Sequence, residues 1–251
     1  MLTATNPYTG QDIHNYDSLN EEGVNITIAK AVNAFDSWRT MPIKQRAEVL
    51  RSVAASLRQN KPLLSKLMAE EMGKPVKEGG PEVEKAAWCA EFYAEHAEAY
   101  LSDEVLPSDA TESYVCYQPL GTLLGILPWN APLWLAFRYL APALMAGNTC
   151  VMKHDPNVPG CAQAIEQVFK EAGAPVGIMV NLPVETALVE KAIRHPDIAA
   201  VSFTGSAGAG AKVASMAASE ASIAFCKWTI SSWSLVTRNS SVIPEIATRE
   251  T

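Results

Sequence analysis

Residues 121–153 read GTLLGILPWNAPLWLAFRYLAPALMAGNTCVMK and contain the pattern that decides the fold. An apolar run over 122–127 stops at Pro128, and a polar turn with Asn130 leads into an apolar, helix-like segment. A second apolar run then ends at Lys153. This order predicts a strand, a tight turn, a helix and a second strand, which together form one βαβ unit. In open parallel sheets, ligands bind at the carboxyl ends of such strands.

The same alternation continues after Lys153. Residues 162–169 have a helical pattern, 178–180 and 199–203 are short strand-like runs, and Gly205–Gly210 opens another helix. Strands that alternate with helices at this spacing predict an α/β fold with a doubly wound parallel sheet.

The residues before this sheet are mostly helical. After a short irregular or hairpin segment, apolar periodicity predicts a helix from Asn25 to just before Pro42 and a second one that ends before Asn60. A third helix is expected between Asn60 and Gly73, and Pro81 is expected to open a fourth. The first hundred residues should therefore form a helical layer.

These patterns divide the chain into three regions. Residues 1–113 are expected to form an N-terminal helical region that packs on the sheet, and residues 114–220 the parallel-sheet core. The tail, residues 221–251, has no glycine, is rich in serine and threonine and lacks a sustained period. We expect neither regular secondary structure nor a continuation of the alternation in that tail.

Composition argues against several classes of protein. The chain has 251 residues, and its net charge of −7 disfavours nucleic acid as a partner. Prolines interrupt the longest apolar segment, which argues against a membrane span, and the N-terminus has no secretory pattern. The five cysteines form no C-x-x-C pair, so neither a disulfide framework nor a metal site is expected. We expect a cytoplasmic protein that handles small molecules.

Three polar features lie at predicted strand ends. Asn130, held between two prolines, can offer its amide N–H to an oxyanion, or it can simply form the turn. Lys153 can bind ribose hydroxyls or a phosphate, or be an ordinary surface lysine. The helix N-terminus at Gly205–Gly210 can bind phosphate with the help of Ser206, although its small residues can also serve close packing. Its G-x-x-G-x-G spacing differs from the dinucleotide fingerprint.

Two histidines, His154 and His195, are candidate bases. His195 precedes Pro196 at a predicted helix end, which favours a capping or surface role. His154 follows Lys153, and a structural role is again the stronger interpretation.

Taken together, four segments in this order and spacing resemble the aldehyde dehydrogenase superfamily. They are Gly125–Pro132 (GILPWNAP), Leu140–Thr149 (LAPALMAGNT), Val151–Lys153 and Val201–Ser206 (VSFTGS). The resemblance covers about residues 3–218. The stretches around Glu70–Pro75 and Lys153–Ala162 look most like the bacterial succinate-semialdehyde dehydrogenase branch.

The resemblance implies a fold, a set of site residues and a chemistry. The implied fold is an N-terminal helical region with a Rossmann-like nucleotide-binding domain. Asn130 would be the oxyanion-hole amide, and no metal is implied. The residues implied to bind cofactor are Leu127, Pro128 and Trp129 along its length, Lys153 at the adenosine ribose, and Gly205, Ser206 and Gly210 at the pyrophosphate.

The implied reaction is oxidation of an aldehyde to its carboxylate. A thiolate would attack the aldehyde, a hydride would pass to NAD or NADP, and the thioester would be hydrolysed. Succinate semialdehyde is the expected substrate, and members of the family would be homo-oligomers.

The sequence departs from the family pattern at three places. Pro156 stands where many NAD-specific members have a ribose-binding glutamate, which favours acceptance of NADP. Residues Asn181–Glu185 replace a glycine-containing loop. Neither the E-L-G-G segment of the general base nor the G-Q-x-C segment of the nucleophile occurs. We therefore expect a C-terminally truncated or frame-shifted chain without the catalytic domain, inactive by itself.

Two other interpretations stay open at this point. The chain could be a non-catalytic nucleotide-binding or oligomerisation module. It could also be an unrelated Rossmann-type reductase, although it lacks both that fingerprint and a Ser/Tyr/Lys constellation.

Overall fold

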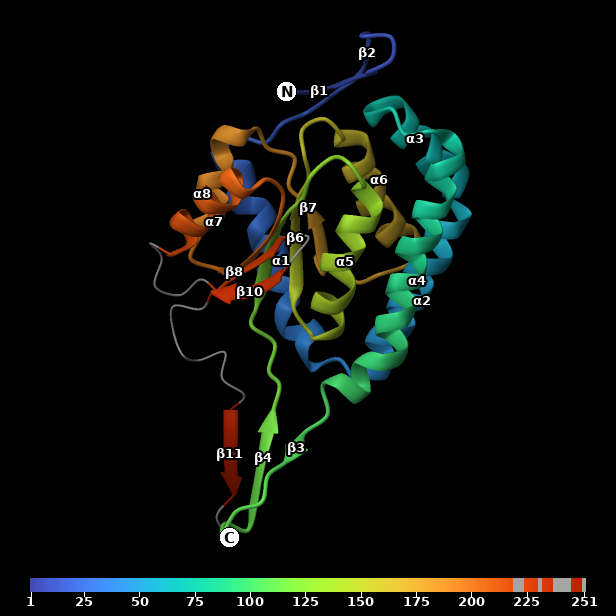
Figure 1. The fold of residues 1–251 in the computed structure, drawn as a ribbon. Helices are drawn as coiled ribbons and strands as arrows, with labels where there is room; N and C mark the ends of the chain where they lie inside the picture. Colours follow the sequence, from blue (N-terminus) through green and yellow to red (C-terminus); the bar gives the residue numbers. More distant parts are fainter. Residues whose placement is uncertain (219–223, 230–231, 237–244, 250–251) are drawn as a thin grey trace.

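A mostly parallel sheet lies at the centre of the structure (Figure 1). The computed structural model describes residues 1–218, 224–229, 232–236 and 245–249. In this part of the chain the central sheet has the order β10-β9-β8-β5-β6-β7. Its strands are β5 (Thr122–Ile126), β6 (Thr149–Lys153), β7 (Met179–Asn181), β8 (Ile198–Thr204), β9 (Ala224–Thr229) and β10 (Ser232–Val236). Strands β5 to β9 are parallel and β10 is antiparallel to β9, so the predicted α/β class is confirmed.

Helices cover both faces of this sheet, as Figure 1 shows. One layer contains α2 (Ile43–Gln59), α4 (Val76–Tyr100), α5 (Pro132–Met145) and α6 (Pro159–Glu171). The other contains α1 (Glu21–Thr40), α7 (Val189–Ile193) and α8 (Ala207–Ala218), and the short 3₁₀ turn η1 (Thr186–Leu188) precedes α7. Along β6 the side chains alternate, because Cys150 and Met152 join the first layer and Val151 the second. The core is thus divided by the sheet.

The N-terminal segment begins with a hairpin. Strands β1 (Leu2–Thr5) and β2 (Asp12–Tyr16) are antiparallel, which confirms the hairpin alternative. Helix α3 (Lys61–Met72) begins after Asn60 and ends at Gly73, whose φ of 73° is the left-handed conformation expected of a terminating glycine. Both ends of this helix match the sequence prediction.

Two predicted helix starts are wrong. Helix α1 begins at Glu21, because the side chain of Asn20 accepts a hydrogen bond from the N–H of Gly23 at 2.9 Å. Helix α4 begins at Val76 and contains Pro81 instead of opening there. The turn before Pro81 is held by close packing, since a Cβ on Gly79 would lie 2.9 Å from Ser65 of α3.

The prediction for the tail is wrong in the residues that the structure describes. Residues 224–229 form β9, which pairs parallel to β8 and continues the alternation past α8. The stretch AFCKWT has no clear alternation of apolar and polar residues, so its sequence does not predict a strand. It is a strand because its backbone pairs with β8. Residues 219–223, 230–231, 237–244 and 250–251 lie outside the described part.

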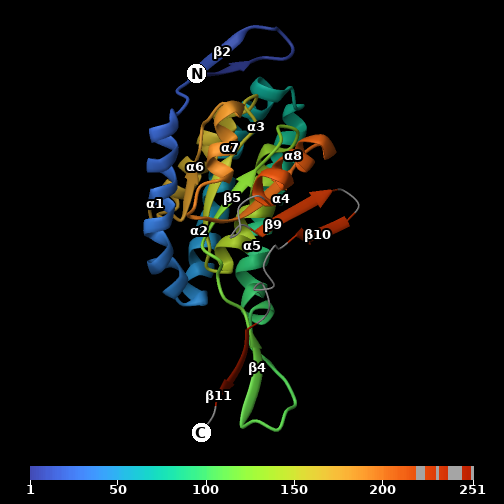
Figure 2. The same cartoon turned by 90° about the vertical axis from the view of Figure 1, so that its left-hand side faces the viewer.

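A second, smaller sheet projects away from the central one (Figure 2). It contains β3 (Glu104–Val105), β4 (Glu112–Cys116) and β11 (Glu245–Arg249) in the order β11-β4-β3. The polar segment over 102–113 therefore contains a short strand, β3. None of the helices in the described part of the chain has the length and apolar character needed to span a bilayer.

Candidate functional site

A cavity of about 750 Å³ opens where β5 and β8 end. Its walls are the β5–α5 turn, the first two turns of α5 and the β8–α8 turn. The lining residues are Pro128, Trp129, Asn130, Ala131, Trp134, Leu135, Arg138, Thr204, Gly205 and Ser206. Because β5 and β8 are neighbours in the sheet, Asn130 and Ser206 reach the same space from segments far apart in the sequence.

Helix α5 packs closely on β5. The hydroxyl of Tyr139 donates to the carbonyl of Leu123 at 2.7 Å. A Cβ on Gly125 would collide with the Tyr139 ring. Glycine at this position therefore lets α5 approach the strand closely enough to fix the turn between them.

Two buried glutamates hold the helices that follow β5 and β6. The carboxylate of Glu82 accepts the N–H groups of Leu133 and Trp134 at 2.9 and 3.2 Å, and also pairs with Lys74. In the same way, Glu71 accepts the N–H groups at the start of α6, from Gly160 at 2.7 Å and Cys161 at 2.8 Å. A negative side chain at a helix N-terminus satisfies free N–H donors and the helix dipole. The α3–α4 pair thus positions the turn that carries Asn130.

The β8–α8 turn is capped by its own serine. The hydroxyl of Ser206 accepts the N–H of Ala209 at 3.3 Å, and its carbonyl accepts the N–H of Gly210 at 2.9 Å. A Cβ on Gly208 would meet no atom within 4 Å, so the start of α8 faces open space. The first N–H groups of this helix are therefore accessible to an anionic group.

The eight predicted site residues divide into two groups. Pro128, Trp129, Asn130, Gly205 and Ser206 line the cavity. Leu127, Lys153 and Gly210 do not line it, and all three are buried. Burial lowers the pKa of Lys153, which stands at the end of β6 opposite Ile126. The alternative of a surface lysine is therefore wrong.

His154 is a structural residue. One ring nitrogen, Nδ1, accepts the N–H of Asp155 at 3.0 Å, so the other, Nε2, donates to the carbonyl of Pro132 at 2.9 Å. Burial lowers the pKa of this histidine to about 4. Its hydrogen bonds tie the end of β6 to the start of α5. His195 stays within its own turn, where Nδ1 accepts the N–H of Asp197 at 3.3 Å. Neither lines the cavity.

The three buried cysteines, Cys89, Cys150 and Cys161, are not activated nucleophiles. Burial raises the pKa of Cys89 to about 11 and of Cys150 to about 12, and it raises that of Cys161 as well. A thiol of this kind stays protonated and unreactive near neutral pH. Cys226 lies in β9, outside the described side chains. Among the described residues, no group of three potential ligands is placed to hold a metal ion.

Sequence reasoning missed Arg138. Among the described residues that line the cavity, it alone carries a charge. Its guanidinium carbon lies 5.5 Å from the Trp134 ring centre, and Lys85 Nζ lies 4.1 Å from the same centre. The available signal was a single arginine in the otherwise uncharged stretch of α5, one helical turn after Trp134.

Two curated relatives of this chain carry the same activity in their names. The chain is 42% identical over 221 residues to a probable succinate-semialdehyde dehydrogenase [NADP(+)] of Synechocystis sp., which covers 88% of this chain and 49% of the relative. It is 39% identical over 212 residues to the succinate semialdehyde dehydrogenase [NAD(P)+] Sad of Escherichia coli, covering 84% of this chain and 46% of the relative. The chain thus spans about half the length of the curated relatives it matches.

A solved structure and a family model agree with these relatives. The succinic semialdehyde dehydrogenase of Streptococcus pyogenes, in complex with NADP+, superposes with a TM-score of 0.86 at 29% identity. The match covers 90% of this chain and 50% of that one. The model of the aldehyde dehydrogenase family matches residues 1–227. This chain belongs to the aldehyde dehydrogenase family.

Proposed function

We propose that the chain supplies the nucleotide-binding part of an enzyme that oxidises succinate semialdehyde with NAD+ or NADP+. The observation that carries the proposal is the presence of Asn130, Arg138 and Ser206 in one cavity. Asn130 and Ser206 come from two different turns and Arg138 from helix α5; they offer an amide, a capped helix start and a guanidinium, respectively. We assign the amide to the aldehyde oxygen, the guanidinium to the substrate carboxylate and the helix start to the cofactor pyrophosphate.

Arg138 favours a substrate that carries a carboxylate as well as an aldehyde. A guanidinium binds a carboxylate through two parallel hydrogen bonds, and aromatic rings can support it. With Trp134 beside it, Arg138 would hold the carboxylate of an aldehyde acid, and the aldehyde carbon would then face Asn130. The amide N–H of Asn130 would stabilise the negative oxygen that forms when the carbonyl is attacked.

The cofactor would be held along the rim of the sheet. The pyrophosphate would meet the first N–H groups of α8, next to Gly205 and Ser206, where the open space at Gly208 admits it. Pro128 and Trp129 would line the cofactor, and Pro156 leaves room for a 2′-phosphate. When bound, the nicotinamide supplies the hydride acceptor. A cytoplasmic location and homo-oligomeric assembly stay predictions.

The purified chain alone is expected to form no NADPH from succinate semialdehyde. The described cavity contains no thiol and no carboxylate, so neither the attacking group nor the base is present in it. NADP+ is expected to bind only weakly, as measured by calorimetry. Steady NADPH formation would contradict this expectation, whereas tight NADP+ binding without turnover would favour a non-catalytic nucleotide-binding module.

A chimera tests the substrate assignment. Residues 1–218 would be joined to the remaining half of the Escherichia coli relative, and NADPH formation would be followed with succinate semialdehyde and with butanal. In this chimera, Arg138→Leu should raise the KM for succinate semialdehyde about tenfold, because one charge-assisted contact is lost. The KM for uncharged butanal should change little. An equal change for both aldehydes would count against the role of Arg138.

A further inference from the structure

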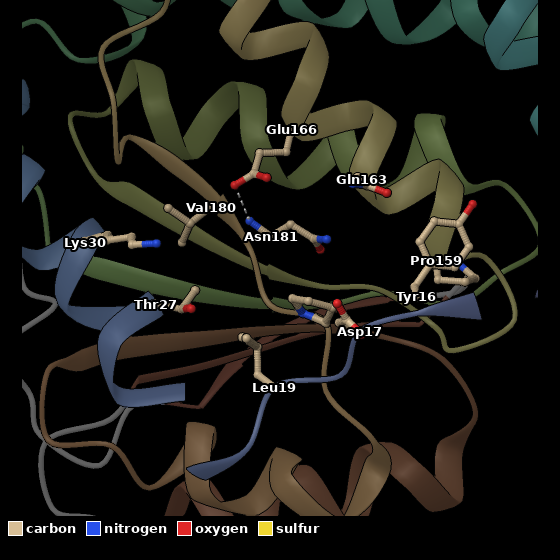
Figure 3. Close-up of a pocket in the computed structure, with 11 residues that line it drawn as sticks. Tyr16, Asp17, Leu19, Thr27, Lys30, Pro159, Gln163, Glu166, Val180 and Asn181 are labelled. Atoms are coloured by element: carbon tan, nitrogen blue, oxygen red, sulfur yellow. Dashed lines mark hydrogen bonds between the residues drawn. The ribbon is translucent and has the colours of Figure 1, made fainter. Parts of the chain in front are cut away.

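A second cavity lies at the free edge of the central sheet, away from the first. It has a volume of about 320 Å³ and is formed by the segment after β2, by α1, by α6 and by β7 with the loop that follows it. None of its lining residues borders the cavity that contains Asn130. Figure 3 shows Lys30 and Thr27 of α1 on one side, with Asn181 and Asp17 across from them.

Polar groups on both sides of this cavity lack partners. The Oδ1 atom of Asn181 is buried without a hydrogen bond in the described structure. Thr27 is 7% exposed as a residue, and its hydroxyl has no hydrogen-bond partner in the described part of the chain, although this oxygen itself is not fully buried. A buried polar group without a partner costs about 1–3 kcal/mol, so such groups usually face a ligand or water. One water molecule takes up roughly 30 Å³, far less than this cavity.

Two sides of the cavity carry opposite charges, Lys30 on one and Asp17 on the other, and these two side chains form no ion pair with each other. Lys30 lies one turn after Thr27 on the same face of α1, and it forms no ion pair with any described residue. Asp17, on the other side, likewise has no described ion-pair or hydrogen-bond partner. The third charged residue, Glu166, is already engaged: it pairs with Lys170 at 3.2 Å and accepts the N–H of Asn181 at 3.3 Å.

We propose that this cavity binds a small zwitterionic amino acid. The carboxylate of the ligand would contact Lys30 and the hydroxyl of Thr27. The ammonium group would contact the carboxylate of Asp17, which lines the cavity together with Asn181. A simple anion would meet two carboxylates, and a simple amine would meet the Lys30 ammonium, so neither satisfies both sides. The volume suits a molecule of a few carbon atoms.

The test is a calorimetric titration of the purified chain with straight-chain amino acids from glycine to 6-aminohexanoate. The series covers different separations between the two charges. For each length, the carboxylate and the amine of the same carbon number serve as singly charged controls. At least one amino acid should bind about tenfold more tightly than both of its controls, because it alone gains charged contacts at both ends.

A lysine variant and its control test whether Lys30 binds the carboxylate of the ligand. Lys30→Met should weaken the best amino acid about tenfold, towards the affinity of its amine control. Lys77→Met is the matched control, since Lys77 is also an exposed helical lysine without an ion-pair partner among the described residues. It should leave binding unchanged. Thr27→Val, which keeps the shape of the side chain, should also weaken binding while preserving the thermal stability.

Three results would each overturn the proposal. The first is the absence of heat with every amino acid at millimolar concentration. The second is equal affinity for an amino acid and its singly charged control. The third is an equal effect of Lys30→Met and Lys77→Met. Because none of these measurements uses turnover, their failure leaves the assignment of the first cavity untouched.

Discussion

Replacing Glu82 with leucine should lower the free energy of unfolding by about 3–5 kcal/mol. The side chain is 7% exposed, pairs with Lys74 and accepts the N–H groups of Leu133 and Trp134. Leucine leaves the Lys74 ammonium without its partner in a largely buried position, and it removes the cap of α5 at the same time. Urea denaturation followed by circular dichroism measures the change.

Two further variants separate the charge from the cap. Glu82→Gln keeps an acceptor oxygen for the α5 N–H groups and should therefore cost less than the leucine variant. Glu78→Leu is the control, because Glu78 is an exposed glutamate in the first turn of the same helix. It should change stability by no more than about 1 kcal/mol. A loss below that limit for Glu82→Leu would show that other contacts hold the turn before α5.

Stability should also fall when the solution is acidified, and His154 should be a main cause. The unfolded chain takes up a proton at this histidine near its ordinary pKa of 6.5, whereas burial in the folded protein lowers the pKa to about 4. Protonation between these values therefore favours the unfolded state. The stabilising contribution is complete above pH 6.5 and is lost as the pH falls towards 4. Its loss should reach about 2 kcal/mol by about pH 5.

The variant His154→Gln isolates this contribution. Glutamine can still donate to the carbonyl of Pro132, but it does not titrate. Burial raises the pKa of Glu71, which acts in the opposite direction, and that term is common to both proteins. The difference in unfolding free energy between wild type and variant should therefore shrink steadily from about pH 7 to about pH 5. A difference that stays constant over this range would rule out His154 as the titrating group.

The parallel sheet could be predicted because its signals are local. Each strand from β5 to β8 is a short apolar run, and proline or glycine marks the turns between these elements. Asn130 and Ser206 were predicted to share one rim because both follow strands that run in the same direction. The two residues line one cavity because β5 and β8 are also neighbours in the sheet.

Other features depend on partners that no local pattern shows. Arg138 looks like a solvated residue until the cavity beside α5 is known. The caps supplied by Glu71 and Glu82 join segments that are far apart in the chain. Lys153 ends a strand, and sequence could not show that neighbouring elements would bury it. The β9 strand exists through pairing with β8, which the composition of the tail does not show.

The two caps from α3 and α4 bear on how the chain could be dissected. The boundary drawn after residue 113 crosses the middle of β4, and it also separates both carboxylates from the helices they hold. A fragment that starts there would keep every described strand of the central sheet and lose the acceptors at the beginnings of α5 and α6. The helical segment is synthesised first and then supplies the caps of α5 and α6, so we expect the sheet region to fold stably only when this segment is attached.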